Sequence, residues 1–297
     1  MVLPIQAGRN ASLDTIDIDK TILSGQVFLW QKIGDKWYGV DGSRLLRITM
    51  AAGRVEEARS FPDENQDAVA RFLRLDDDME SIVASISIDP FISNLVRAHR
   101  GLRLLRQDPR QCLVSFLCAS NTNIQMIRRM LSQLCAKLGE TAIIDGHKFH
   151  LFPTPERLAQ SSLEELRTCG LGYRAGAVHG LAVKLSNKEF DIDACRKMDY
   201  ARAKEELMSL DGVGNKIADC VLLFAFDKLE SFPIDVWIAR ALASVCGLQA
   251  PIKFAEKLTP NQYKVLSESA RSRYGYYAGY AQQLIYYHIR QVAGKKW

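Results

Sequence analysis

The sequence predicts an α+β protein in which a small N-terminal antiparallel β domain packs on a larger α-helical domain. Residues 15–60 contain short runs of aromatic and β-branched side chains, and turn signals such as Asp41-Gly42 separate these runs. From about residue 64 the apolar residues recur instead at the helical period. A chain of 297 residues is long enough for two domains, which we expect over residues 1–100 and 101–297.

In the first domain we expect three short strands. They lie at residues 27–30, 37–40 and 45–49. Gly34-Asp35 separates the first two, and Asp41-Gly42 separates the last two. Asp-Gly is a strong signal for a tight hairpin turn, so the strands should pair antiparallel.

In the second domain several expected helices have recognisable ends. One apolar stripe consists of Ile124, Ile127, Leu131, Leu134 and Leu138. Gly139 follows this stripe at the expected C-cap. Ser162 and Glu165 have the spacing of a capping box, and Asp235 precedes an apolar segment that it could cap.

Basic residues favour an anionic partner, although only mildly, because the net charge is +5 and the pI is near 8.8. Five arginines recur every three or four residues: Arg97, Arg100, Arg103, Arg106 and Arg110. A helix over this stretch would place them on one face. A solvated face with surface ion pairs is the alternative interpretation.

The cysteines and the first residues indicate a soluble intracellular protein. The seven cysteines are odd in number and form no Cys-x-x-Cys pair, so neither a disulfide framework nor a zinc site is expected. No charged segment followed by a long apolar run begins the sequence. We expect no membrane association, and a location in the cytoplasm or nucleoid of a prokaryote or in the nucleus of a eukaryote.

The most informative segment is residues 210–220. It predicts a helix, a tight hairpin formed by Gly212, Val213 and Gly214, and a second helix that begins at Asn215. Two glycines two positions apart let the backbone approach another surface closely. The unpaired N–H groups at the start of the second helix suit a phosphate. Such a hairpin can also serve as a DNA clamp without any catalysis.

Lys216 directly follows the hairpin, and Asp235 comes further along, after Pro233-Ile234. A neutral amine can attack a sugar carbon, and burial at a helix N-terminus favours the neutral form. A carboxylate can stabilise the positive charge that develops as a base leaves. The pair predicts a base-excising enzyme. A phosphate contact for Lys216 and a plain helix cap for Asp235 are the alternatives.

Base excision from duplex DNA requires a pocket for the extruded base and a group that fills the gap. Tyr173 and Arg174 lie in a glycine-rich loop and could supply a planar wedge and a bidentate donor. Asn121 offers an amide suited to a base edge. Gln282 and Tyr286 stand four positions apart on one expected helix and could hold a base by hydrogen bonding and stacking. Glycine turns, caps and core packing are the alternatives for these groups.

Together these segments resemble the eukaryotic-type 8-oxoguanine DNA glycosylase/AP lyase family of the helix-hairpin-helix glycosylase superfamily. The matching stretches are SGQVFLW (24–30), GLRLLRQDP (101–109), CASNTNI (118–124), LGYRA (171–175), VGNKIADC (213–220), PIDV (233–236) and YAGYAQ (277–282). They extend over nearly the whole chain, and their number and order distinguish the resemblance from a single shared motif.

The resemblance implies an enzyme that removes 8-oxoguanine, preferably opposite cytosine, through a lysine Schiff base and then nicks the abasic strand by β-elimination. Lys216 would be the nucleophile and Asp235 the catalytic carboxylate. The implied partner is double-stranded DNA containing oxidised guanine, bound by a monomer. No metal or organic cofactor is implied.

The resemblance also implies how the base is recognised. The carbonyl of Gly25 would accept the N7 hydrogen that the oxidised guanine carries and guanine lacks. Gln282 would bind the Watson–Crick edge. Cys220 and Tyr286 would sandwich the base, with tyrosine in place of the phenylalanine expected in the family.

On the opposite strand, Tyr173 would wedge into the duplex, while Arg174 and Asn121 would contact the orphaned cytosine. Met126 stands where the family has an arginine that also contacts this cytosine, so we expect a relaxed preference for cytosine. Trp237 stands where a phosphate-contacting histidine is expected, so DNA contacts there should differ.

Other functions remain open. Thymine-glycol and adenine glycosylases of the superfamily usually carry a C-terminal four-cysteine iron–sulfur loop, whereas no cysteine follows Cys246. An alkyl-purine glycosylase normally lacks the lysine. A non-catalytic DNA-binding module would need neither Lys216 nor a base pocket. The shorter N-terminal region, without an evident targeting signal, favours a prokaryotic version of the enzyme.

Overall fold

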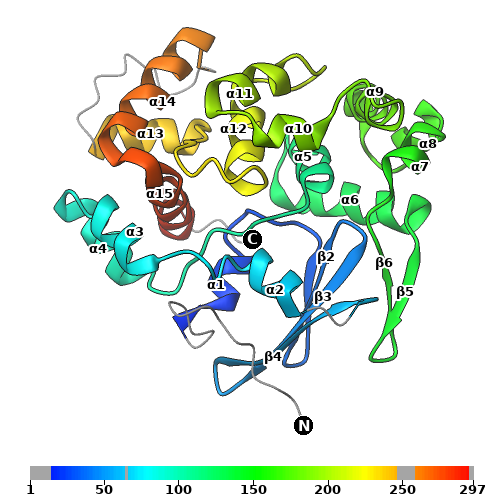
Figure 1. Ribbon diagram of the computed structural model, residues 1–297, viewed down its shortest axis with the longest axis horizontal. Helices are drawn as coiled ribbons and strands as arrows, with labels where there is room; N and C mark the ends of the chain where they lie inside the picture. Colours follow the sequence, from blue (N-terminus) through cyan, green and yellow to red (C-terminus); the bar gives the residue numbers. More distant parts are fainter. Residues whose placement is uncertain (1–14, 64–65, 246–257, 294–297) are drawn as a thin grey trace.

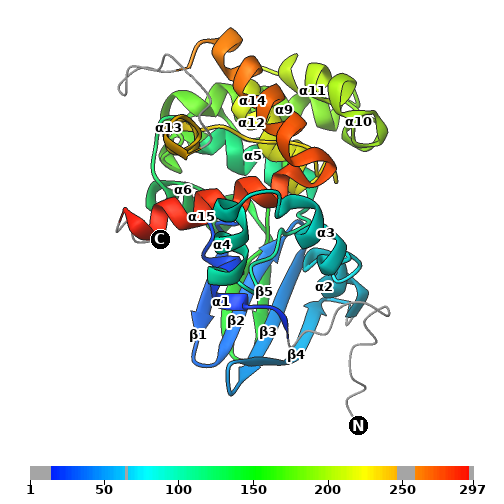
Figure 2. The ribbon, with the colours of Figure 1, turned by 90° about the vertical axis from the view of Figure 1, so that its left-hand side faces the viewer.

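The computed structural model describes residues 15–63, 66–245 and 258–293. It consists of a four-stranded antiparallel sheet in the N-terminal part and a larger helical part, as Figure 1 shows. The predicted α+β class is therefore confirmed. In Figure 2 the sheet lies at one end of the molecule, and the helix α15 (Ala278–Val292) runs across its middle.

The sheet has the order β1-β2-β3-β4. Its strands are β1 (Trp30–Ile33), β2 (Lys36–Asp41), β3 (Arg44–Ala51) and β4 (Arg54–Phe61). The predicted strands at 37–40 and 45–49 are confirmed. The first expected strand, at 27–30, is displaced, because β1 begins at Trp30 and continues to Ile33. The Leu29 carbonyl still accepts from the N–H of Val40 at 3.0 Å, whereas Val27 and Phe28 are buried before the strand begins. β4 was not predicted, since its charged residues obscure the alternation.

The turn between β2 and β3 is fixed by Asp41-Gly42 and by the helix behind it. Gly42 has a φ of +62°, which favours glycine. Its N–H donates to Gln111 Oε1 at 2.8 Å, and a Cβ atom on it would come within 2.9 Å of Asp108 Cγ. This close approach joins the hairpin to the first turn of α5 (Pro109–Cys118).

The remaining helices are as follows. Before α5 lie α1 (Ile18–Ile22), α2 (Gln66–Phe72), α3 (Met79–Ile86) and α4 (Pro90–Ala98). After it lie α6 (Ile124–Leu138), α7 (Pro155–Ala159), α8 (Leu163–Thr168), α9 (Ala175–Ser186), α10 (Ile192–Lys197), α11 (Tyr200–Met208), α12 (Asn215–Phe224), α13 (Val236–Val245) and α14 (Pro260–Tyr274), with short 3-10 turns η2 (Gly172–Arg174) and η3 (Gly275–Tyr277). The first hundred residues thus contain α1 to α4 besides the sheet.

The predicted ends of several helices are confirmed. The apolar stripe of α6 is buried along its length, and Gly139 is its C-cap. Ser162 and Glu165 form a reciprocal capping box at the start of α8. The short hairpin of β5 (Thr141–Ile144) and β6 (His147–His150) was not predicted, although Asp145-Gly146 between its strands is a turn signal of the kind used for the first sheet.

The single helix expected for the five arginines is wrong. α4 ends before Gly101, which has a φ of +87°, and α5 begins only after Asp108. The intervening segment is extended through the core, where Arg103 is 3% exposed and donates to the carbonyl of Arg74 at 3.1 Å. Arg106 pairs with the side chains of Asp76 and Asp227. Arg103 and Arg106 therefore form intramolecular bonds and do not belong to an exposed basic face.

The sheet is buried on both faces. Trp37 and Leu46 belong to a small core with α1 and α2, whereas Tyr38 and Leu45 join the main core of the helical part. Tyr38 also stacks on Phe149 of β6, with ring centroids 4.9 Å apart. Neighbouring residues of one strand thus bind the two parts of the protein together.

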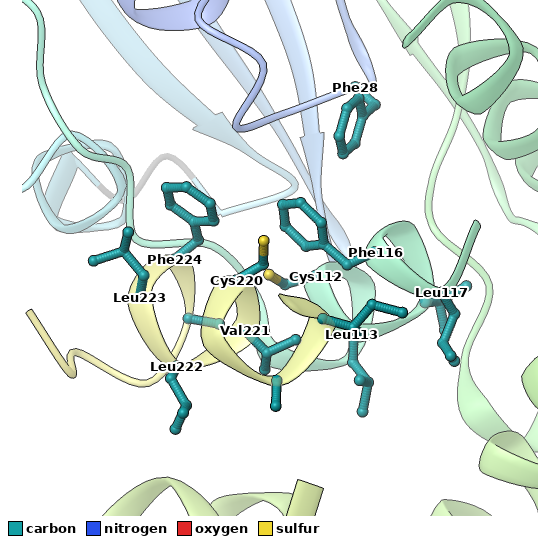
Figure 3. Packing of buried hydrophobic residues seen from close by; sticks show 14 of the residues in the cluster. Phe28, Cys112, Leu113, Phe116, Leu117, Cys220, Val221, Leu222, Leu223 and Phe224 are labelled. Carbon is teal, nitrogen blue, oxygen red and sulfur yellow. The ribbon is translucent and has the colours of Figure 1, made fainter. Parts of the chain in front are cut away.

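The main core centres on α5 and α12, which pack side by side in Figure 3. Phe116 stacks on Phe224 with centroids 5.6 Å apart, and Phe28 meets the edge of Phe116 at 5.7 Å. Cys112 and Cys220 point toward one another between these rings. This packing holds α12 against α5, and the site is built at the start of α12.

None of the helices in the described ranges is long and apolar enough to cross a membrane. Within the same ranges, no group of three or more His, Cys, Asp or Glu side chains is arranged to hold a metal ion. The six cysteines of this part of the chain are free and buried. Cys246 lies outside the described residues.

Candidate active site

The predicted hairpin connects α11 to α12. Gly212 has a φ of +80°, and a Cβ atom on it would lie 3.0 Å from the Cβ of Ala177. Val213 is buried and anchors the loop in the core. Gly214 is the N-cap of α12 and provides no side chain that could bond to the first N–H groups of the helix. The helix therefore begins with donors that suit an oxyanion such as phosphate.

A cavity of about 660 Å³ lies beside this helix start. From the predicted set, its wall contains Gly25, Asn121, Gly212, Gly214, Lys216, Cys220, Asp235, Gln282 and Tyr286. These residues come from segments far apart in the sequence, so the fold brings the predicted base pocket and the predicted catalytic pair together. The volume is in the range typical of small-molecule sites.

Lys216 lies in the first turn of α12 and is half-buried. Its Nζ atom is 5.2 Å from the centroid of the Phe116 ring, which the α5–α12 packing holds in place. The amine therefore lies over the face of an aromatic ring, at the positive, N-terminal end of the α12 helix dipole.

Asp235 occupies the turn before α13. Its Oδ1 atom accepts from the N–H groups of Trp237 and Ile238, at 2.9 Å each. The predicted helix cap is confirmed. Both of these bonds go to one carboxylate oxygen, and the residue also lines the cavity, so capping and a catalytic role are compatible.

Two cavity-lining side chains that are predicted to contact the base, Cys220 and Tyr286, are neutral. Burial raises the pKa of the Cys220 thiol to about 12. Burial, followed by the charge of Asp235, raises the pKa of Tyr286. Both side chains are therefore uncharged at neutral pH, as suits the two flat faces of a base.

Gln282 supplies a polar group to the cavity wall and is 5% exposed. Its Nε2 atom donates to the carbonyl of Pro233 at 3.0 Å. Because that carbonyl can only accept, the bond fixes the orientation of the amide. Gln282 Oε1 is left without a hydrogen-bond partner among the residues that the structure describes. Such a buried acceptor is costly unless a ligand supplies a donor.

Tyr173, Arg174 and Asn121 lie together, and of the three Asn121 lines the cavity whereas Tyr173 and Arg174 do not. The hydroxyl of Tyr173 and Nε of Arg174 both donate to the carbonyl of Ser120, each at 3.1 Å. Asn121 Nδ2 donates to the Tyr173 hydroxyl at 3.3 Å, and the Arg174 guanidinium lies 4.5 Å from the Tyr173 ring centroid. Tyr173 is nevertheless 67% exposed. An exposed aromatic ring is thus bonded to Ser120 and Asn121, which line the cavity.

Two further predicted positions flank the cavity. Met126 is 40% exposed on the first turn of α6, where its N–H donates to the Asn123 side chain at 3.0 Å. Trp237 lines the cavity and lies 5.5 Å from the guanidinium of Arg240.

A buried network behind the site was not predicted. Asp219 on α12 is fully buried, and its carboxylate accepts from Tyr200 at 2.7 Å, Tyr263 at 2.6 Å and Lys204 at 2.9 Å. Burial and the Asp219 charge raise the pKa of both tyrosines, which therefore remain donors. The Tyr263 hydroxyl accepts in turn from the N–H of Ile234 at 3.2 Å. The network thus connects the helix of Lys216 to the residue before Asp235.

Asp219→Ala is expected to lower the free energy of unfolding by about 3–5 kcal/mol, because it leaves the Lys204 ammonium and two hydroxyls without their acceptor. Urea unfolding measures this change. Asp193→Ala is a matched control, since that carboxylate is 59% exposed and pairs with Arg110 at the surface. Its expected loss is below about 1 kcal/mol. Equal losses in the two variants would contradict a stabilising role for the network.

Comparison with known proteins agrees with this geometry. Residues 10–113 match the family described as 8-oxoguanine DNA glycosylase, N-terminal domain, and residues 114–261 match the HhH-GPD superfamily of base excision DNA repair proteins. The chain is 35% identical to the N-glycosylase/DNA lyase OGG1 of Arabidopsis thaliana, over 90% of this chain and 75% of that protein. It is 31% identical to the N-glycosylase/DNA lyase of Saccharomyces cerevisiae, over 75% and 67% respectively.

The fold is similar to that of a solved relative. The 8-oxoguanine glycosylase/lyase of Clostridium acetobutylicum, in complex with double-stranded DNA containing cytosine opposite 8-oxoguanine, superposes with a TM-score of 0.84 at 25% identity. The match covers 94% of this chain and 93% of that one.

Proposed function

The chain belongs to the 8-oxoguanine DNA glycosylase/AP lyase family of the helix-hairpin-helix superfamily, and we propose that it removes 8-oxoguanine from duplex DNA by base excision. The extruded base would enter the cavity that Lys216 and Asp235 line. The protein would act as a monomer and would prefer lesions opposite cytosine.

The unfilled acceptor of Gln282 is the observation that carries the choice of base. The Watson–Crick edge of a guanine-type base presents two neighbouring donors, N1–H and the N2 amino group. Adenine presents one donor at this edge, the N6 amino group, and its N1 is an acceptor where guanine has the N1–H donor. A site that is built to hydrogen-bond one edge rejects analogues that lack it.

A second contact separates 8-oxoguanine from guanine, which share that edge. The Gly25 carbonyl would accept the hydrogen on N7 of the oxidised base. Guanine carries a lone pair at N7, so the same carbonyl would face an acceptor and repel it. Gly25 lines the cavity, which supports this role.

The proposed chemistry has two steps. The Nζ atom of Lys216 attacks C1′, the bond from C1′ to the base breaks, and the base leaves with the bonding electrons and takes up a proton. Asp235 stabilises the positive charge that develops on the sugar. The sugar ring then opens to a Schiff base. Loss of a C2′ proton and cleavage of the C3′–O bond nick the strand on the 3′ side of the lesion.

Two groups of residues would contact the DNA outside the base pocket. The N–H groups that begin α12 would bind a backbone phosphate, as the hairpin geometry favours. Tyr173 would fill the gap in the duplex, with Arg174 and Asn121 contacting the base left behind. Their shared hydrogen bonds with each other and with Ser120 support a joint role.

The test is incubation of the purified protein with a duplex that holds one 8-oxoguanine opposite cytosine, beside the same duplex with guanine. We expect free 8-oxoguanine and a nicked strand from the first duplex and neither product from the second. Release of a different damaged base, with 8-oxoguanine left intact, would indicate that the protein is a glycosylase of the same superfamily for another lesion. Binding without any release would favour the non-catalytic module.

Met126→Arg is expected to increase the ratio of excision opposite cytosine to excision opposite adenine by roughly tenfold, since one bidentate base contact contributes about 1–3 kcal/mol of discrimination. Met208→Arg adds the same charge at a methionine that is also 40% exposed, but on α11. Single-turnover excision from the two duplexes gives the ratio. An equal rise in both variants would indicate a general effect of charge on DNA binding.

A further inference from the structure

Residues 24–26, called here the recognition turn, connect α1 to the first strand and carry Gly25 at a φ of +83°. Glycine adopts either sign of φ at little cost, so the backbone of Gly25 does not by itself fix the direction of its peptide groups. That direction must be set by the neighbours of the turn.

Two buried glutamines hold the carbonyls on either side of Gly25. Gln283 Nε2 donates to the carbonyl of Ser24 at 3.0 Å, and Gln107 Nε2 donates to the carbonyl of Gln26 at 3.0 Å. Both glutamines are 3% exposed. The Gly25 carbonyl therefore lies between two carbonyls whose directions are fixed from outside the turn.

The side chain of Gln26 anchors the turn to the extended segment before α5. Its Nε2 atom donates to Ser24 Oγ at 2.7 Å and to the carbonyl of Arg103 at 2.8 Å, while its Oε1 accepts from the N–H of Leu105 at 2.9 Å. Gln26 is fully buried. One side of the turn is thus tied to the core, and Gln283 ties it to α15.

We propose that Gln283 is a specificity-determining positioning residue, which aims the Gly25 carbonyl at the base by holding the carbonyl of Ser24. This inference rests on the proposed function, because it concerns how the oxidised base is told apart from guanine. Gln282 and Gln283 are consecutive on α15 and differ by about 100° around the helix. One reaches the Watson–Crick edge and the other reaches the recognition turn, so a single helix sets both contacts to the base.

Ser24 is fully buried, so loss of the Gln283 donor would leave its carbonyl buried without a hydrogen-bond donor. The cost of such an unpaired group favours rotation of the peptide toward another donor. Because the next peptide belongs to Gly25, its carbonyl would change direction with little steric resistance. The oxidised base would lose the acceptor for its N7 hydrogen, and guanine would be repelled less.

The experiment compares Gln283→Met, which keeps the side-chain volume but removes the donor, with Gln283→Ala. Gln291→Met is the matched control, since Gln291 is exposed on the same helix. Single-turnover rates are measured for 8-oxoguanine excision opposite cytosine and for nicking of a preformed abasic site. Nicking needs Lys216 and an intact fold but no base recognition. An undamaged duplex is added as a competitor in a parallel series.

In both Gln283 variants we expect the ratio of excision to nicking to fall about tenfold, as loss of one buried hydrogen bond predicts. The undamaged duplex should compete correspondingly better. A wild-type ratio in Gln283→Met, or a parallel fall of both rates, would overturn the inference and leave Gln283 a packing residue. A wild-type protein that releases no 8-oxoguanine would contradict the proposed function itself, and the inference would fall with it.

Discussion

Replacement of Lys216 with glutamine is expected to abolish base release and strand nicking together. Glutamine keeps much of the length and polarity of the side chain but has no nucleophilic amine, so the bond to C1′ cannot form. Removal of a catalytic nucleophile lowers the rate by a factor on the order of 10³–10⁶. Affinity for the lesion duplex should change far less, because the hairpin and the base pocket remain.

The control for this prediction is Lys264→Gln. Lys264 is 70% exposed on α14 and lies 4.0 Å from Glu268. Its replacement removes the same charge without touching the cavity and should leave both steps unchanged. If Lys216→Gln continued to release the base at the wild-type rate, the nucleophile would be misassigned and Lys216 would be a phosphate contact.

Asp235→Asn is expected to lower the excision rate by about 10²–10⁴-fold while leaving the free energy of unfolding within about 1 kcal/mol of wild type. Asparagine caps a helix about as well as aspartate, so the bonds to the N–H groups of Trp237 and Ile238 can persist. What is lost is the negative charge that stabilises the sugar cation. The variant therefore separates the cap from the catalytic role.

Asp235→Ala completes the comparison, because it removes both the charge and the cap. Its excision rate should fall as that of Asp235→Asn does, and its free energy of unfolding should also fall by about 1 kcal/mol. Single-turnover excision and urea unfolding give the two quantities. An active Asp235→Asn with an inactive Asp235→Ala would show that Asp235 acts through the geometry of α13 alone.

Local signals in the sequence predicted the elements that depend on neighbouring residues. The apolar stripe of α6, the capping box at Ser162 and the hairpin before α12 each follow from spacing within a few positions. The arginines at 97–110 satisfied the same kind of spacing, yet no continuous helix forms there. A positive φ at Gly101 and the cap at Asp108 break the segment, and buried partners such as Asp227 hold Arg106.

The site was predictable where a motif carries the chemistry. The glycine hairpin marks Lys216, and Pro233-Ile234 marks Asp235. The resemblance to a known family then linked these two residues to Gly25 and Gln282. Asp219 and Gln283 have no such mark. Each is a lone polar residue on a mostly apolar helix face, and its role arises from partners that are distant in the sequence, such as Tyr263 and Ser24.

The central claim is that Lys216 forms a Schiff base with the sugar of an excised 8-oxoguanine. Borohydride reduces such a Schiff base to a stable amine, so it traps the protein on a duplex that holds 8-oxoguanine opposite cytosine. We expect a covalent adduct from the wild-type protein and none from Lys216→Gln. Release of the free base without any adduct from the wild type would contradict the claim.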